Sequence, residues 1–192
     1  MSTAADLCFD EASHTYHVGG VRWPSVTEVL DPLLELDGIP RHVLDAAAAF
    51  GSNVHAACHL YNQGRLDEAS LDPALAPYLF GWKQFLADTG AIVVASELRV
   101  SHKQLRYAGT LDTIAMIDRR RELVDIKSTA EIPRTVGPQT AAYAEAKGEP
   151  RIRRRVVQLR ADGDYRSRVL TNRTDFNVFV SCLNIWRFRN AV

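Results

Sequence analysis

YAGTLDTIAMIDRRRELVDIK, residues 107–127, is the stretch that decides the fold. Two apolar runs flank a polar joint, and this pattern predicts a β-hairpin. Residues two apart in a strand face the same side of the sheet, so Asp125 and Lys127 project together. If Arg119–Arg120 form a two-residue loop, Asp112 falls opposite Lys127, although a bulge would change this pairing. The stretch therefore predicts two carboxylates and an ammonium group on one patch of the sheet.

Carboxylates that converge repel each other unless a cation neutralises them. Mg²⁺ suits such a site, because proteins bind it through one or two carboxylates together with waters and substrate phosphate. A lysine beside the ion can hold a scissile phosphate or an attacking water. The alternative is an exposed hairpin with an ordinary ion pair, because the triplet Asp125-Ile126-Lys127 is of a very common type.

Four motifs follow one another along the chain: Pro24-Ser-Val-Thr27, Gly51-x-x-x-His55, Gly109-x-x-Asp112 with Asp125-x-Lys127, and Gln139-x-x-x-Tyr143. Their order resembles the PD-(D/E)XK nuclease superfamily. The likeness is closest to its RecB-like branch, which includes helicase-linked nuclease domains, phage exonucleases and the mitochondrial genome maintenance exonuclease. The segment that begins at Pro24 is similar to the entry motif of phage-type members. The resemblance extends from about Trp23 to Tyr165, which is most of the chain.

The resemblance implies an α/β fold with a mixed central β-sheet flanked by helices, a restriction-endonuclease-like core. It also implies a metal-dependent DNA nuclease of exonuclease type that leaves 5′-phosphates and uses Mg²⁺ or Mn²⁺. The residues that it assigns to the site are the metal ligands His55, Asp112, Asp125 and the Ile126 backbone carbonyl, the supporting acidic residue Glu97, the catalytic Lys127, and Gln139 and Tyr143, which orient Lys127 or contact DNA.

The charge distribution is compatible with nucleic-acid binding, although the net charge of the 192 residues is zero. Residues 147–192 contain eleven Lys or Arg and four Asp or Glu, so this segment carries +7 and the remainder carries −7. A basic segment beside an acidic body suits phosphate binding next to a metal centre. Arg151, Arg153 and Arg155 alternate on one face of a predicted strand and are the candidate DNA contacts. The alternative is a solvated basic face without a partner.

Ser25-Val-Thr-Glu28 predicts the start of a helix, because it has the capping-box pattern and follows a proline. This structural role accounts for both Ser25 and Glu28. A phosphate contact by Ser25 or Thr27 at the helix N-terminus is the functional alternative.

Gly51 lies inside a predicted alanine-rich helix, where it costs roughly 1 kcal/mol relative to alanine. Close approach of this helix to the sheet would compensate. Gly51 and His55 share one helix face, so the same approach would bring His55 to the carboxylates of the hairpin. His59 lies on that face one turn further on and belongs to no motif.

The remaining elements are predicted from hydrophobic periodicity and turn residues. They are a hairpin within residues 7–23 with a turn at Gly19-Gly20, helices at 40–62, 73–88 and 138–147, a strand at 91–100, a hairpin at 151–160 and 165–170, and a basic C-terminal helix at about 174–190 capped by Asp175. This order predicts one domain over residues 1–192 with its core at about 23–170.

Cys8, Cys58 and Cys182 are too few for the four-cysteine iron–sulfur cluster of some RecB-like nucleases, and all three are expected to be buried thiols. No apolar run approaches the ~20 residues of a membrane span, and the N-terminus lacks the pattern of a signal peptide. A cytoplasmic protein without membrane contacts is therefore expected.

Two alternatives to an independent nuclease stay open. One is a DNA-binding or assembly module that kept the fold and lost the chemistry, which the full set of His55, Asp112, Asp125 and Lys127 argues against. The other is a nuclease subunit that is active only with a helicase. A single-strand annealing or binding protein is a further candidate partner.

Overall fold

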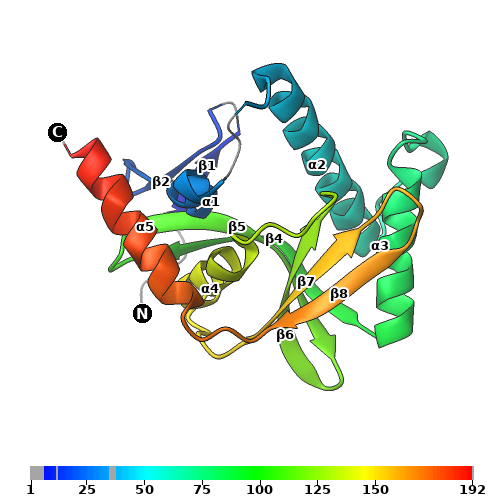
Figure 1. Cartoon of the computed structure of the whole chain (residues 1–192). Coiled ribbons are helices and arrows are strands. Elements are labelled where there is room, and N and C mark those ends of the chain that lie inside the picture. Colours follow the sequence, from blue (N-terminus) through cyan, green and yellow to red (C-terminus); the bar gives the residue numbers. More distant parts are fainter. Residues whose placement is uncertain (1–6, 12, 35–37, 192) are drawn as a thin grey trace.

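The computed structural model describes residues 7–11, 13–34 and 38–191 and is built around a mixed five-stranded sheet (Figure 1). The strands, in sheet order, are β4 (Ile92–His102), β5 (Tyr107–Ile117), β6 (Arg120–Lys127), β7 (Arg153–Leu159) and β8 (Tyr165–Leu170). Neighbouring strands are antiparallel except β6 and β7, which are parallel. A parallel pair needs a crossover connection, and helix α4 (Val136–Ala146) supplies it. The predicted α/β class with a mixed sheet is confirmed.

Helices cover both faces of this sheet (Figure 1). They are α2 (Arg41–Asn62) and α3 (Ala76–Thr89) on one side, and α1 (Val26–Leu30), α4 and α5 (Asp175–Asn190) on the other. Successive residues of β6 serve the two cores: Leu123 packs with α1, α4 and α5, and Val124 packs with α2 and α3. None of the described helices is long and apolar enough to cross a membrane.

The N-terminal segment forms a second, antiparallel sheet of three strands, β1 (Leu7–Asp10), β2 (Thr15–Val18) and β3 (Val21–Trp23). The predicted hairpin is therefore confirmed and gains a strand, because the Gly19-Gly20 turn joins β2 to β3. Both glycines have positive φ, of 58° and 79°, a backbone conformation that suits glycine.

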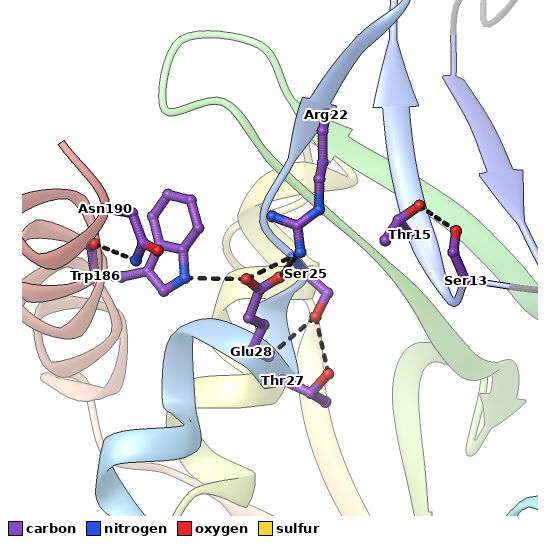
Figure 2. Close-up of polar contacts among 8 residues, drawn as sticks. All are labelled: Ser13, Thr15, Arg22, Ser25, Thr27, Glu28, Trp186 and Asn190. Atoms are coloured by element: carbon purple, nitrogen blue, oxygen red, sulfur yellow. Dashed lines mark hydrogen bonds and ion pairs between the residues drawn. The ribbon is translucent and has the colours of Figure 1, made fainter. Parts of the chain in front are cut away.

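Helix α1 begins with the predicted capping box. The Glu28 N–H donates to the Ser25 hydroxyl at 3.0 Å, and the Ser25 N–H donates to the Glu28 carboxylate at 3.4 Å. The same carboxylate accepts from Arg22 at 3.1 Å and from the Trp186 indole at 3.2 Å, as Figure 2 shows. Glu28 thus joins β3, α1 and α5, and its structural role is confirmed.

The turn between β5 and β6 lies one residue earlier than predicted. Ile117 pairs with Arg120, so the two loop residues are Asp118 and Arg119, with φ of 50° and 62°. Two-residue hairpin loops of this kind need positive φ at both positions, and aspartate tolerates it better than most residues. The predicted loop Arg119–Arg120 is therefore wrong, and the register moves by two residues. A shift of two leaves every side chain on its predicted face.

Two predicted helix starts differ from the structure. The helix predicted from residue 73 begins at Ala76, and the Asp72 carboxylate accepts the Ala74 N–H at 2.9 Å in the turn that precedes it. Asp175 is not the cap of α5, because Thr174 occupies that position without a side-chain bond. Asp175 is 6% exposed and receives Arg154 at 2.9 Å, so its charge is used in a tertiary ion pair. Short 3₁₀ turns occur at Asp31–Leu33 and Glu68–Ser70.

Two further expectations are corrected. Cys8 is exposed, whereas Cys58 and Cys182 are buried as predicted, and all three are free thiols. A β-carbon placed on Gly51 would meet only the Ser128 hydroxyl, at an ordinary contact distance of 3.6 Å. Helix α2 therefore does not approach the sheet closely at Gly51, and that explanation of the glycine is wrong.

Candidate functional site

The site is built where strands β5 and β6 part. Their paired register runs from Ile117–Arg120 to Thr113–Val124. Just past the last pair, the Ile126 N–H donates to the Asp112 carboxylate at 2.7 Å. A side chain therefore accepts this backbone N–H of β6. Asp112 is held rigidly at the fork as a result, with only 9% of its surface exposed.

His55, Glu97 and Asp112 each bring one ligand atom to a common point, and these atoms all lie within 4.8 Å of one another. The three residues come from α2, β4 and β5. The closest defined contact joins His55 Nδ1 to an Asp112 oxygen at 3.4 Å. Burial disfavours the imidazolium, but the Asp112 carboxylate outweighs burial and raises the pKa of His55. Burial likewise opposes ionisation of Asp112, yet His55 holds the pKa of that carboxyl below its ordinary value.

Glu97 reaches this group because its backbone is unusual. Its φ is 52°, in the left-handed region that residues with a β-carbon seldom adopt. The residues before and after it, Ser96 and Leu98, pair with Thr113 and Leu111, so Glu97 lies across from Asp112. Burial and the Asp112 charge raise the pKa of Glu97 to about 7. Strained positions of this kind are concentrated at functional sites, so the φ supports a ligand role for Glu97.

Asp125 and Lys127 form the second half of the site. Lys127 Nζ lies 2.8 Å from an Asp125 oxygen, and the Asp125 side chain is 1% exposed. Apart from this ammonium, neither oxygen of Asp125 has a hydrogen-bond partner among the described residues. Burial raises the pKa of Asp125 to about 6, and the neighbouring charge of Asp112 adds to the increase. Burial disfavours the Lys127 ammonium, but Asp125 and Asp112 outweigh it and raise the pKa of Lys127.

Helix α4 supplies two residues, Gln139 and Tyr143, to the wall of the site. The Gln139 amide donates to the Tyr143 hydroxyl at 3.4 Å, and Tyr143 is 4% exposed. Burial raises the pKa of the Tyr143 phenol well above its ordinary value, so it remains a neutral hydrogen-bonding group. Gly109 is needed for this approach, because a β-carbon there would lie 2.6 Å from the Tyr143 ring. The Gly109 of the motif therefore has a packing reason.

These residues open into a cleft of about 650 Å³. Eight of the residues predicted from sequence line it, including two from the start of α1: Ser25, Thr27, His55, Glu97, Asp112, Lys127, Gln139 and Tyr143. Phe9, His14, Tyr16, Thr110 and His59 also line it and were not predicted. Tyr16 and Thr110 share a 2.8 Å hydrogen bond, and His59 Nδ1 lies 2.6 Å from the Ser96 hydroxyl. The place of His59 in the cleft could have been predicted from its four-residue spacing to His55. No sequence signal marks the other four residues.

The predicted DNA contacts Arg153 and Arg155 on β7, and Arg151 before it, are not among the residues that line this cleft. Arg155 donates to the Glu122 carboxylate at 2.7 Å, and Arg153 approaches the same group at 3.3 Å. Both face the opposite side of the sheet from Asp125, because β6 residues three apart point to opposite faces. Arg151 precedes the strand and is exposed. A DNA role for these arginines stays a prediction.

The donor set fits a hard divalent cation. Two carboxylates and an imidazole converge at the fork, and the nearby buried Asp125 forms one ion pair among the described residues, with Lys127. Carboxylate-rich sites of this type suit Mg²⁺ or Mn²⁺. Glu97 belongs to the three-residue group and Asp125 lies outside it, beside Lys127. The Ile126 carbonyl as a further ligand stays a prediction.

Comparison with known proteins leaves the family open: no protein-family model and no curated protein sequence matches the chain.

Proposed function

We propose that this chain is a metal-dependent DNA nuclease that hydrolyses phosphodiester bonds, acting as an exonuclease and leaving 5′-phosphates. The observation that carries the proposal is the convergence of His55, Glu97, Asp112 and Lys127 on a single cleft, with the buried Asp125 paired to Lys127. An ordinary surface hairpin would not bury its carboxylates with so few donors, because unpaired buried charge is costly. The resemblance of the motifs to RecB-like nucleases supports the same chemistry.

The residues of the site would have different roles, in metal binding and in binding the water or phosphate. Asp112, fixed by the Ile126 N–H, would hold Mg²⁺ or Mn²⁺ together with His55, Glu97 and Asp125. When bound, the ion would supply positive charge to the phosphate and lower the pKa of a water. Lys127 has three N–H donors and no lone pair when protonated, so it would hold the attacking water or a phosphate oxygen and not the ion.

Other groups would position the substrate. Tyr143 and Gln139 are linked by a hydrogen bond at the wall of the cleft, where they would orient Lys127 or contact the strand. Ser25 and Thr27 also line the cleft, and the Ser25 hydroxyl is engaged with the Glu28 N–H and with Thr27. The Ser25 hydroxyl has a capping role, and a phosphate contact by Ser25 or Thr27 stays a prediction.

The test is degradation of linear DNA by the purified chain with and without Mg²⁺ or Mn²⁺. Lys127→Ala should retain metal binding and DNA binding but lower cleavage by about 10³-fold or more, since charge stabilisation in the transition state is lost. Asp125→Ala should lose metal affinity and cleavage together. Lys83→Ala is the matched control, because Lys83 is paired with Glu68 away from the cleft.

The outcomes separate the alternatives. If Lys127→Ala cleaves as fast as the parent, the proposed mechanism is wrong. If the parent binds DNA and cleaves none with either metal, the chain is a binding or assembly module, or it requires a helicase partner. Adding a helicase-containing extract would not distinguish these two; a purified complex would be required. Circular DNA compared with linear DNA separates endonuclease from exonuclease activity.

A further inference from the structure

A second cavity of about 1210 Å³ lies beside α4 and is rich in arginine. Six arginines and two glutamates line it: Arg120, Arg121, Arg151, Arg153, Arg154 and Arg173, with Glu145 and Glu149. They come from the β5–β6 hairpin, α4, the segment before β7, β7 itself and the loop before α5. We call this cavity the arginine groove. It combines residues from five parts of the chain. Arg151 and Arg153 are candidate DNA contacts from the sequence, whereas the grouping with the other four arginines was not predicted.

The arginine groove is distinct from the catalytic cleft. Helix α4 presents Gln139 and Tyr143 to the cleft but Ala141 and Glu145 to the groove. Each residue turns an α-helix by about 100°, so the two pairs lie about 200° apart around the helix axis. The helix therefore stands between the two cavities.

Half of the arginines in the groove have structural partners. Arg121 approaches Glu149 at 3.3 Å, while Arg153 pairs with Glu122 and Arg154 with Asp175. Arg154 also donates to the Gly137 carbonyl at 2.8 Å. These contacts hold the walls of the groove.

The other half carries charge without a partner. Arg120, Arg151 and Arg173 are exposed and have no ion-pair partner among the described residues. Three guanidinium groups that surround one groove repel each other. Of the two glutamates in the lining, Glu149 is paired with Arg121 and Lys147, so the lining keeps an excess of positive charge. Arginine suits phosphate because its planar fork binds two phosphate oxygens at once. The groove therefore fits an extended partner with several phosphates better than one small anion.

We infer that the arginine groove binds the phosphate backbone of the nucleic acid that extends out of the cleft. This inference rests on the proposed nuclease function. A helix is about 10–12 Å across, and phosphates along one DNA strand are spaced by about 3.4 Å along the axis, so the path around α4 takes several nucleotides. A very short oligonucleotide would fill the cleft alone, whereas a probe of about 30 nucleotides would reach both cavities.

The experiment measures binding of fluorescent probes by anisotropy in EDTA, where no cleavage occurs. The variant Arg120→Glu/Arg151→Glu/Arg173→Glu should bind a probe of about 30 nucleotides at least tenfold more weakly than the parent. Its salt dependence should also fall, by about 1 in the slope of log K against log salt for each arginine that contacts a phosphate. Arg173→Glu and Arg65→Glu form a matched pair of single reversals, because Arg65 is exposed and lines neither cavity.

Cleavage is measured separately, with a probe of about six nucleotides and Mg²⁺ or Mn²⁺. It should be unchanged in Arg120→Glu/Arg173→Glu, which leaves the candidate DNA contact Arg151 in place. Unchanged affinity and salt slope for the long probe would contradict phosphate binding in the arginine groove. An equal loss of affinity in Arg65→Glu and Arg173→Glu would contradict it as well. Loss of short-probe cleavage in a variant with parental circular dichroism would show that the groove is part of the catalytic cleft, which also overturns the inference. If the parent cleaves nothing but the long-probe effect is found, the groove stands and the proposed nuclease function fails.

Discussion

Strand β6 carries two buried carboxylates, Glu122 and Asp125, whose surroundings are opposite. Glu122 is completely buried. Both of its oxygens accept hydrogen bonds from Arg155, at 2.7 and 3.4 Å, and Arg153 lies 3.3 Å from one of them. Asp125 is 1% exposed on the other face, and among the described residues its one ion-pair partner is the Lys127 ammonium at 2.8 Å. The two residues are three apart in one strand, so sequence position alone does not distinguish them.

The difference separates a structural carboxylate from one that is ready to bind a cation. A buried carboxylate is tolerated when donors replace its lost hydration, and Glu122 meets that condition on both oxygens. Asp125 does not meet it, so its ionised form is costly in the absence of a further cation. Burial raises the pKa of Asp125 to about 6 for this reason.

Removal of Glu122 should destabilise the fold without affecting the metal site. Glu122→Ala leaves Arg155 and Arg153 without their anion, and breaking a buried pair from one side costs about 3–5 kcal/mol. Arg153 is 38% exposed and can regain water, so the lower end of that range is expected. Urea denaturation measures the loss, and calorimetric titration with Mn²⁺ should give a parental affinity at a temperature where the variant is folded.

Glu68→Ala is the control for that experiment. Glu68 also pairs with a cation, Lys83 at 2.5 Å, but its side chain is 51% exposed. Surface pairs contribute about 0–1 kcal/mol, so the loss should be several times smaller than for Glu122. Equal losses at both positions would contradict the view that the Glu122 cluster is a structural centre. Loss of Mn²⁺ affinity in Glu122→Ala would show that the two faces of β6 are coupled.

Asp125→Asn should remove a pH-dependent loss of folding stability. The pKa of Asp125 rises from 3.8 to about 6 on folding, so the folded state holds this proton to higher pH than the unfolded state. Stability of the metal-free parent should therefore fall as pH rises from about 4 to about 6, by up to roughly 3 kcal/mol. The amide cannot ionise, so the variant should lose this part of the pH dependence.

Denaturation at pH 4.5 and pH 7 measures that difference, with Asp118→Asn as the control. Asp118 is an exposed turn residue, so its replacement should leave the pH profile unchanged. The pKa of Glu97 is raised to about 7 and that of His55 is also raised, so the parent profile includes their contributions and the difference between variants isolates Asp125. A variant that keeps the full parental slope would show that Asp125 is not the costly charge.

Much of the fold follows from local patterns. The capping box of Ser25 and Glu28, the Gly19-Gly20 turn and the alternation of β6 depend on neighbouring residues, and the structure has them as predicted. The position of the β5–β6 loop was wrong by one residue, because the choice between Asp118 and Arg120 depends on which residues accept positive φ. The role of Asp175 was also missed, since its partner Arg154 is 21 residues away in the sequence.

The site was predicted in outline for a physical reason. Hairpin parity places Asp112, Asp125 and Lys127 on one face, and this survives a register shift of two residues. No periodicity predicts that Asp112 binds the Ile126 N–H, or that Glu97 turns into the group with a φ of 52°. Both depend on the parting of the two strands, which is a tertiary feature. The aromatic residues of the N-terminal sheet were missed because their cleft exists only after two sheets pack together.

His55→Ala tests whether the imidazole belongs to the cation site or only balances the charge of Asp112. Loss of one neutral ligand should lower metal affinity about tenfold, and raised Mn²⁺ should partly restore cleavage by mass action. His59→Ala is the matched control, one turn further along α2, because His59 is bonded to Ser96 and lies outside the three-residue group. Equal metal affinities in the two variants would remove His55 from the site.

The smallest effect is expected at Gly51, one turn before His55 on the cleft side of α2. Replacing a helix-interior glycine with alanine gains up to about 1 kcal/mol, provided that the new methyl group meets no obstacle. A β-carbon at Gly51 would lie 3.6 Å from the Ser128 hydroxyl, which is ordinary contact. Gly51→Ala should therefore raise the denaturation midpoint slightly and leave metal affinity unchanged.

Gly109→Ala is the opposite case, since its β-carbon would lie 2.6 Å from the Tyr143 ring and overpacking of this kind costs about 1–3 kcal/mol. A loss of stability in Gly51→Ala would mean that α2 lies closer to the sheet than the 3.6 Å contact allows, and that His55 is held by packing as well as by Asp112.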